Sequence, residues 1–177
     1  MDSIVVSGGG ALRGKVQISG AKNTCLKLMS AALLTDQPLT LTNMPRLSDI
    51  KTLSSLLESH GCEVMVQHEG SVMTLNAREI TNRKADYEIV RKLRASFNVL
   101  GPLLAREGEA IVSLPGGCAI GARKVDLHMM AMEKLGAKIK LDGGYVHATA
   151  PNGLVGTVID FPLVSVGATE NALTAAT

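Results

Sequence analysis

The sequence predicts an α/β fold built by repeating one unit, because helical and strand-like segments follow one another twice in the same order. A helical pattern is followed by Gly61 in the first half and by Gly136 in the second, a spacing of about 75 residues. Pro45 and Pro115 each follow a short apolar segment, and they lie about 70 residues apart. Such a repeat indicates one structural unit, here helix, strand, helix, strand, strand.

The first unit is predicted from hydrophobic periodicity and turn residues. Its second helix begins at Ser48, a candidate N-cap, and Gly61 ends it. The apolar stripe of that helix recurs at helical spacing and comprises Ile50, Leu53, Leu56 and Leu57. The other expected elements are a helix at 23–34 and strands at 40–42, 63–66 and 71–75, the last two joined by a turn at Glu69-Gly70.

The second unit repeats this order with a longer first helix. That helix is expected over residues 86–106, with a kink at Gly101-Pro102, because proline interrupts helical hydrogen bonding. The remaining elements are a strand at 111–113, a helix at 125–135, and strands at 138–141 and 145–148 joined at Gly143-Gly144.

A third copy begins near the end of the chain. The segment Gly20-Ala21-Lys22-Asn23 is similar to the one that starts at Gly167-Ala168, about two repeat lengths later. A helix is expected over 170–176, and the last residue, Thr177, falls where its terminating signal would stand. We therefore expect the chain to be a piece of a longer protein.

Composition restricts the class of protein. The 177 residues are 46% hydrophobic and carry a net charge of +2, which favours a globular core and gives no footprint for nucleic acid. Aromatic residues make up 2% with no Trp, so no base-stacking platform is expected. No apolar run is long enough to span a membrane, and no signal peptide is recognisable.

The three cysteines are far apart and form no C-x-x-C pair, which favours the reducing cytoplasm over a disulfide framework. His60 and Cys62 close an amphipathic helix without a partner pair nearby. We interpret them as surface and packing residues, and we expect neither a metal nor a cofactor.

Cys118 lies in the most informative stretch of the chain, residues 115–124. Small residues surround it, and Arg123 and Lys124 follow. Glycines allow a backbone to wrap closely around an anion, and neighbouring cations favour a thiolate. This loop is therefore predicted to carry a reactive thiol beside an anion site, although a lone cysteine is more often a small buried residue.

Three further clusters offer cations near helix starts. Lys22 and Asn23 follow a predicted strand and open a helix, where backbone N–H groups favour anions. Arg94 shares a helical face with Arg91, and a solvated charged face is the alternative reading. Arg123 opens a helix, where an anionic ligand would offset its unfavourable position in the helix dipole.

These segments together resemble the UDP-N-acetylglucosamine enolpyruvyl transferases. The matching motifs occur in the same order over nearly the whole chain, and one of them carries Cys118 in a loop that the related enolpyruvylshikimate phosphate synthases lack. The motifs are Ser19-Gly20-Ala21-Lys22-Asn23, Leu93-Arg94-Ala95-Ser96, Ser113-Leu114-Pro115-Gly116-Gly117-Cys118, Ile120-Gly121-Ala122-Arg123, Val125-Asp126-Leu127-His128 and Val164-Ser165-Val166-Gly167-Ala168-Thr169.

The resemblance implies an inside-out α/β barrel built of repeated βαβαββ units, here two repeats and the start of a third. Residues 1–21 would be a strand segment that belongs to a second, mostly absent domain, and residues 22–177 an incomplete enolpyruvyl-transferase domain. Its repeats would cover about 22–85 and 86–150, with the third beginning at about 160.

The resemblance also implies a reaction, the transfer of the enolpyruvyl group of phosphoenolpyruvate to the 3′-hydroxyl of UDP-N-acetylglucosamine with release of phosphate. This is the first committed step of peptidoglycan synthesis, carried out in the cytoplasm with these two small molecules as partners. Cys118, the residue that fosfomycin alkylates in the family, would supply a proton to the methylene carbon. Lys22 and Arg123 would complete the catalytic set.

Substrate binding is implied for residues of the same motifs. They are Lys22, Asn23, Arg94, Arg123, Lys124, Val125, Asp126, Leu127, Ser165 and Val166. The chain departs from the family pattern at Lys124, Leu163 and Asn98, which bears on sugar-nucleotide binding. The carboxylate expected to deprotonate the sugar hydroxyl is missing, so this chain is expected to be inactive alone.

Two other readings are possible. The chain could be a non-catalytic nucleotide-sugar-binding paralogue, although it retains Lys22, Arg123 and Cys118 together. It could instead be a thiol redox protein, if folding brought Cys25 or Cys62 close to Cys118.

Overall fold

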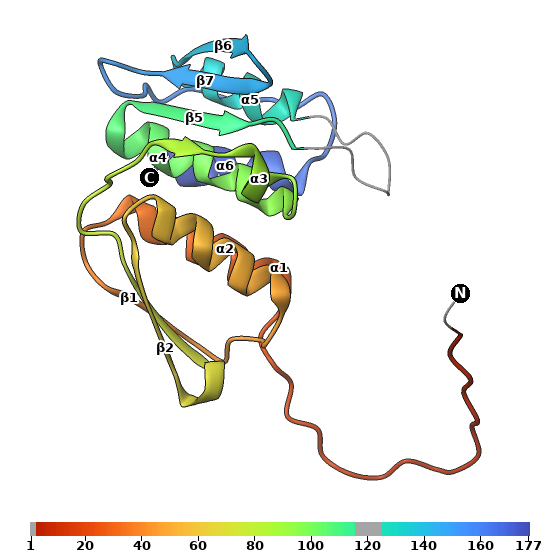
Figure 1. Cartoon of the computed structure of the whole chain (residues 1–177). Coiled ribbons are helices and arrows are strands. Elements are labelled where there is room, and N and C mark those ends of the chain that lie inside the picture. Colours follow the sequence, from red (N-terminus) through yellow and green to blue (C-terminus); the bar gives the residue numbers. More distant parts are fainter. Residues whose placement is uncertain (1–2, 116–124) are drawn as a thin grey trace.

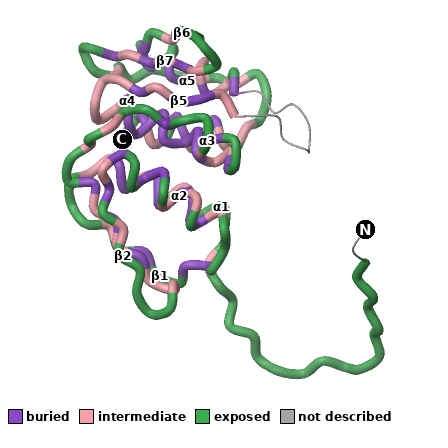
Figure 2. Tube along the Cα trace, viewed as in Figure 1, coloured by how far each residue is buried: buried purple, intermediate pink, exposed green. Residues whose placement is uncertain are grey.

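The computed structural model describes residues 3–115 and 125–177. Residues 3–19 run as an extended, fully exposed segment away from the body of the molecule (Figures 1 and 2). None of the described residues 3–19 lies in a strand, so the strand expected before Lys22 is not formed here. Its end is attached to the first repeat, because the Gly20 amide donates to the Asn43 carbonyl at 2.9 Å. The assignment of residues 1–21 to a second domain stays a prediction.

The first repeat forms a small antiparallel sheet with two helices. Strand order is β1-β3-β2, and β3 pairs with both neighbours. The elements are α1 (Lys22–Ala31), η1 (Ala32–Leu34), β1 (Leu39–Thr42), α2 (Ser48–Ser59), β2 (Glu63–Gln67), η2 (His68–Gly70) and β3 (Val72–Asn76).

The second repeat has the same sheet order with one more strand, β4-β5-β7-β6, in which β4 runs parallel to β5. The third repeat begins with α6 (Val166–Ala175), which starts earlier than the helix expected at 170–176. The elements of the second repeat are β4 (Lys84–Ala85), α3 (Tyr87–Val90), η3 (Arg94–Val99), α4 (Leu100–Glu107), β5 (Glu109–Ser113), α5 (Asp126–Lys134), β6 (Lys138–Asp142) and β7 (Tyr145–Thr149).

The helix expected over 86–106 is broken into α3, η3 and α4, and the predicted kink at Gly101-Pro102 is wrong. The break lies at Leu93, whose backbone is extended (φ −144°, ψ 107°) and whose side chain is buried. Pro102 lies in the first turn of α4, where the backbone N–H that proline lacks would have no partner within the helix.

The boundaries of α2 confirm most of the prediction. The apolar stripe is buried, and Gly61 ends the helix with φ +97°, as Gly136 does after α5 with φ +93°. Ser48 is not the N-cap: Leu47 holds that position, and no side chain caps the helix. Asp49 in the first turn supplies the negative charge that suits a helix N-terminus.

His60 is fully buried, so its interpretation as a surface residue is wrong. Its ring Nδ1 lies 2.7 Å from the carbonyl oxygen of Asn82, which follows β3 and leads into the second repeat. Cys62 is buried too, as a packing residue should be.

The helices of both repeats lie between the two sheets, which form the outer layers (Figure 1). Helix α6 packs on α4 and α5, while α4 also contacts η1 of the first repeat. The outermost strands, β2 and β6, are mostly exposed. This arrangement confirms the expected inside-out α/β architecture. In the part of the chain that the structure describes, no helix is long and apolar enough to cross a membrane.

Candidate substrate-binding site

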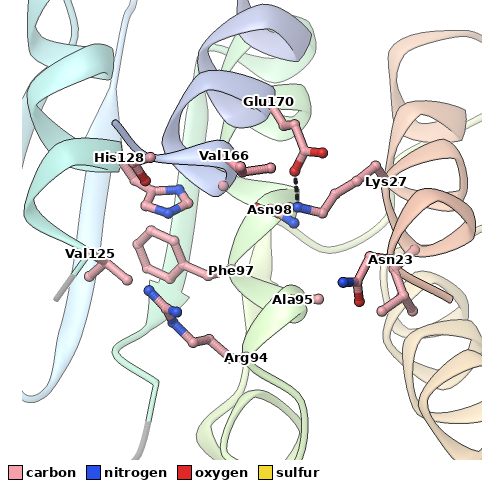
Figure 3. Close-up of a pocket in the computed structure, with 13 residues that line it drawn as sticks. Asn23, Lys27, Arg94, Ala95, Phe97, Asn98, Val125, His128, Val166 and Glu170 are labelled. Atoms are coloured by element: carbon pink, nitrogen blue, oxygen red, sulfur yellow. Dashed lines mark hydrogen bonds and ion pairs between the residues drawn. The ribbon is translucent and has the colours of Figure 1, made fainter. Parts of the chain in front are cut away.

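A pocket of about 390 Å³ opens where elements of all three repeats meet (Figure 3). Helix α1 forms one wall, η3 the floor, and the N-terminal ends of α5 and α6 the other wall. Its lining residues are Asn23, Leu26, Lys27, Arg94, Ala95, Phe97, Asn98, Val125, His128, Ser165, Val166, Gly167 and Glu170.

The N-terminus of α6 faces this pocket. Ser165 is its N-cap, and the hydroxyl oxygen accepts a hydrogen bond from the amide of Ala168 at 3.3 Å. The first turn of α6 holds no acidic side chain. The positive end of the helix dipole therefore favours an anion at this wall.

The break before η3 brings Arg94 into the pocket. Because the chain is extended at Leu93 and then turns, Arg94 lies at the start of a 3₁₀ helix whose Phe97 is buried. Figure 3 shows the Arg94 side chain reaching towards Phe97 and Val125. A guanidinium in this place suits a phosphate or carboxylate ligand.

His128 forms the buried corner of the pocket. Its ring packs edge-on to that of Phe97, with 5.3 Å between the ring centroids, and only 6% of the residue is exposed. Its pKa is lowered from 6.5 to about 4, chiefly by burial and then by the positive charges of Arg94 and Lys27, whereas Asp126 opposes the shift. The imidazole is therefore neutral at pH 7.

Lys27 of α1 and Glu170 of α6 form an ion pair across the pocket (Figure 3). Both side chains are partly exposed, at 22% and 35%. The pair ties the first repeat to the third, and its carboxylate reduces the positive charge that the cavity presents.

The structure brings five of the predicted substrate-binding residues to this one pocket, namely Asn23, Arg94, Val125, Ser165 and Val166. Lys22 is not among the lining residues, and its amine pairs with Asp49 at 2.8 Å. Asp126 and Leu127 form the first turn of α5 beside the pocket, where the Leu127 amide donates to Asp126.

Cys118, Arg123 and Lys124 lie outside the described residues, so their predicted roles stay predictions. The two other thiols, Cys25 and Cys62, are buried, and burial raises the pKa of each. They are poorly suited to act as resolving thiolates, which weakens the redox reading.

The sequence did not single out Lys27, Phe97 and Glu170 as site residues. It pointed to Asn98 only as a departure from the family pattern, and to His128 and Gly167 only as members of motifs. Helical spacing could have found several of them. Lys27 is four residues after Asn23, and Glu170 four after Val166, so each shares a helical face with a predicted residue.

No metal centre is evident in the described ranges 3–115 and 125–177, where no three His, Cys, Asp or Glu side chains gather. Apart from the Glu170 carboxylate, which is paired with Lys27, the polar groups of the pocket are two cations, a neutral imidazole, a hydroxyl, amides and a helix N-terminus. This set of donors recognises anionic oxygen atoms.

The chain belongs to the EPSP synthase (3-phosphoshikimate 1-carboxyvinyltransferase) family, whose model matches residues 6–177. At the sequence level the chain is 65% identical over 178 residues to the UDP-N-acetylglucosamine 1-carboxyvinyltransferase of Paracoccus denitrificans. The protein of that name from Ruegeria pomeroyi is 60% identical over 177 residues. Each alignment covers 100% of this chain but 42% of the relative, so the chain spans less than half the length of these proteins.

Solved structures show the same fold at low identity. The enolpyruvyl transferase NikO from Streptomyces tendae matches with a TM-score of 0.78 and 22% identity, over 95% of this chain and 39% of that one. EPSP synthase from Acinetobacter baumannii matches with a TM-score of 0.72 and 16% identity, over 92% of this chain and 37% of that one.

Proposed function

We propose that the protein containing this chain transfers the enolpyruvyl group of phosphoenolpyruvate to the 3′-hydroxyl of UDP-N-acetylglucosamine and releases phosphate. The name of the relatives that are 60–65% identical over the whole chain supports this reaction. The pathway would be peptidoglycan synthesis, in the cytoplasm, with consequences for cell shape and division. This activity belongs to the whole protein, of which the chain would supply part of the active site.

The observation that carries the proposal is the meeting of Asn23, Arg94 and Ser165 at one pocket, although they are far apart in sequence. UDP-N-acetylglucosamine brings a diphosphate, and phosphoenolpyruvate a phosphate and a carboxylate. A pocket lined by Arg94 and by the N-terminus of α6 suits the diphosphate. Val125, Asp126 and Leu127 would contact the nucleotide on the side of α5, with Lys124 beside them.

Lys22 and Asn23 would hold phosphoenolpyruvate together with Arg123. In the structure Lys22 is paired with Asp49, half-exposed and near the pocket wall, so phosphoenolpyruvate would have to displace a partly exposed ion pair. Such pairs contribute about 0–1 kcal/mol, which a doubly charged ligand readily exceeds.

The chemistry would be an addition followed by an elimination. The sugar 3′-oxygen adds to the phosphate-bearing carbon of phosphoenolpyruvate while Cys118 gives a proton to the methylene carbon. The bond from carbon to phosphate oxygen then breaks, a methyl proton leaves, and the enol ether is restored. A carboxylate outside this chain would take the proton of the sugar hydroxyl.

The test is phosphate release from phosphoenolpyruvate, with and without UDP-N-acetylglucosamine, by this chain and by the full-length protein. We expect sugar-dependent release by the full-length protein only, and its severe loss in Cys118→Ala and Lys22→Ala with the fold intact. Binding of the nucleotide sugar without any release would favour a non-catalytic paralogue. Near-normal turnover in either variant would contradict the role of that residue.

A further inference from the structure

Asn171 is a fully buried amide in the middle of α6, and its orientation is fixed from one side. The backbone amide of Gly101, in the first turn of α4, donates to Asn171 Oδ1 at 2.8 Å. A backbone N–H can only donate, so the atom it meets must be the amide oxygen. The Asn171 Nδ2 group therefore points the other way.

On that other side Nδ2 meets His128, at 3.1 Å from ring atom Nδ1. An amide nitrogen can only donate, so Nδ1 must accept. A neutral imidazole has one N–H, and it is therefore on Nε2. The His128 pKa of about 4 agrees with a ring that stays neutral beside Arg94 and Lys27.

The Nε2 edge of the ring lies against Gly167, at the start of α6. A Cβ atom at Gly167 would be 3.3 Å from both Nε2 and Cε1, closer than side chains ordinarily pack. Both residues line the pocket, and no residue that the structure describes makes a hydrogen bond to Nε2. The Nε2 edge of His128, a residue of which only 6% is exposed, therefore adjoins the pocket beside the N-terminus of α6, within reach of a ligand bound there.

We propose that Asn171 is a positioning residue, which holds His128 as the neutral Nε2–H tautomer so that His128 donates to an anionic oxygen of the bound substrate. The proposal rests on the proposed function for its ligand, the diphosphate of UDP-N-acetylglucosamine. Gly101 and Gly167 serve the same arrangement: a Cβ on Gly101 would lie 2.3 Å from Asn171 Oδ1. A fixed donor costs no reorganisation when the anion arrives.

The first test observes the tautomer directly. Long-range ¹H–¹⁵N spectra of the full-length protein at pH 7 report which ring nitrogen of each histidine carries hydrogen, and loss of a signal in His128→Gln assigns it. We expect His128 to be protonated on Nε2 alone. In Asn171→Asp the carboxylate can only accept, so hydrogen should appear on Nδ1. Hydrogen on Nδ1 of the unaltered protein would overturn the proposal.

The second test separates positioning from structure by a double-mutant cycle read as the Kd of UDP-N-acetylglucosamine. Asn171→Leu should weaken binding about ten-fold, because a hydrogen bond to a charged group is lost. In the background of His128→Phe it should weaken binding no further. Thr174→Val, one turn along α6, removes a hydroxyl that bonds only to its own helix and is the matched control.

Equal weakening by Asn171→Leu in both backgrounds would show a merely structural role and refute the proposal. If Asn171→Leu fails to fold, the tautomer of the unaltered protein and the effect of His128→Phe alone still decide it. Absence of any sugar-nucleotide binding by the unaltered protein would refute the proposed function and the donor role together. A tautomer on Nδ1 with normal binding would refute the positioning role alone.

Discussion

The two complete repeats end their second helix in the same way, yet with different residues at the same place. After α2 the carbonyl of His60 accepts from the Thr81 amide at 3.0 Å, and after α5 the carbonyl of Leu135 accepts from the Val155 amide at 2.8 Å. Both side chains are buried. The backbone therefore specifies this turn, and the side chain beneath it is free to differ.

The repeats differ more in their first helices. Helix α1 with η1 is nearly continuous, whereas the corresponding stretch of the second repeat is interrupted at Leu93. Only the interrupted stretch places an arginine in the pocket, since η3 begins at Arg94. The first repeat thus supplies one wall of the pocket, and the second repeat supplies its floor. The pocket therefore depends on a difference between the two repeats.

The largest effect is expected at Gly101, where the second repeat packs on the third. In Gly101→Ala the new Cβ would meet Asn171 Oδ1 at 2.3 Å and its backbone oxygen at 2.6 Å, so α4 and α6 must separate. Such overpacking costs on the order of 3 kcal/mol, measurable by urea unfolding. Gly156→Ala, with open space around it, is the control and should stay within about 1 kcal/mol. Equal effects would contradict this packing.

Acid should destabilise the fold through His128. Its pKa of about 4 lies below the 6.5 of the unfolded chain, so the unfolded state takes up the proton first as pH falls. The free energy of unfolding should drop between about pH 6.5 and pH 4, by roughly 3 kcal/mol from this residue. Unfolding at several pH values measures it. In His128→Gln the free energy of unfolding should fall less steeply over this pH range. An unchanged dependence on pH would contradict the lowered pKa of His128.

A smaller effect is expected at the turn after α2. There His60 of the first repeat is replaced by leucine, the residue that the second repeat has at the same place, Leu135. Burial lowers the pKa of His60, and its Nε2 has no hydrogen-bond partner among the described residues. His60→Leu should change stability at pH 7 by less than about 1 kcal/mol, because the lost bond to Asn82 is offset by removal of that buried nitrogen. At pH 5 the variant should be the more stable protein. The reverse order at pH 5 would show that His60 is charged in the fold.

The smallest effect is expected from the ion pair inside the pocket. It can be compared with the effect of an exposed ion pair on the first repeat. Glu170→Gln removes a negative charge from the pocket and should tighten UDP-N-acetylglucosamine binding to the full-length protein several-fold, with stability changed by under about 1 kcal/mol. Glu69→Gln, whose partner Arg46 is exposed, is the matched control and should leave the Kd unaltered. Weaker binding in Glu170→Gln would mean that the carboxylate contacts the ligand.

The repeat and the two glycines that end α2 and α5 could be predicted from the sequence, because they depend on local periodicity and on positive φ. The break at Leu93 could not be predicted, since proline is the usual reason to break a helix and here Pro102 lies harmlessly in a first turn. Motifs identified Asn23 and Ser165. Helical spacing places Lys27 and Glu170 on the same faces as Asn23 and Val166, but their ion pair depends on the way α1 faces α6 across the pocket, which no local pattern encodes.

The position of α6 sets the order in which the repeats complete their packing during synthesis. The sheet of the first repeat is complete once residue 76 has emerged from the ribosome, because β1, β2 and β3 pair only with one another. The shared face of α4 and α5 is covered only when α6, whose last residue is Ala175, has also emerged. A nascent chain paused after α5 has emerged and before α6 has done so therefore leaves the shared face of α4 and α5 uncovered, which makes this face a target for a chaperone during translation.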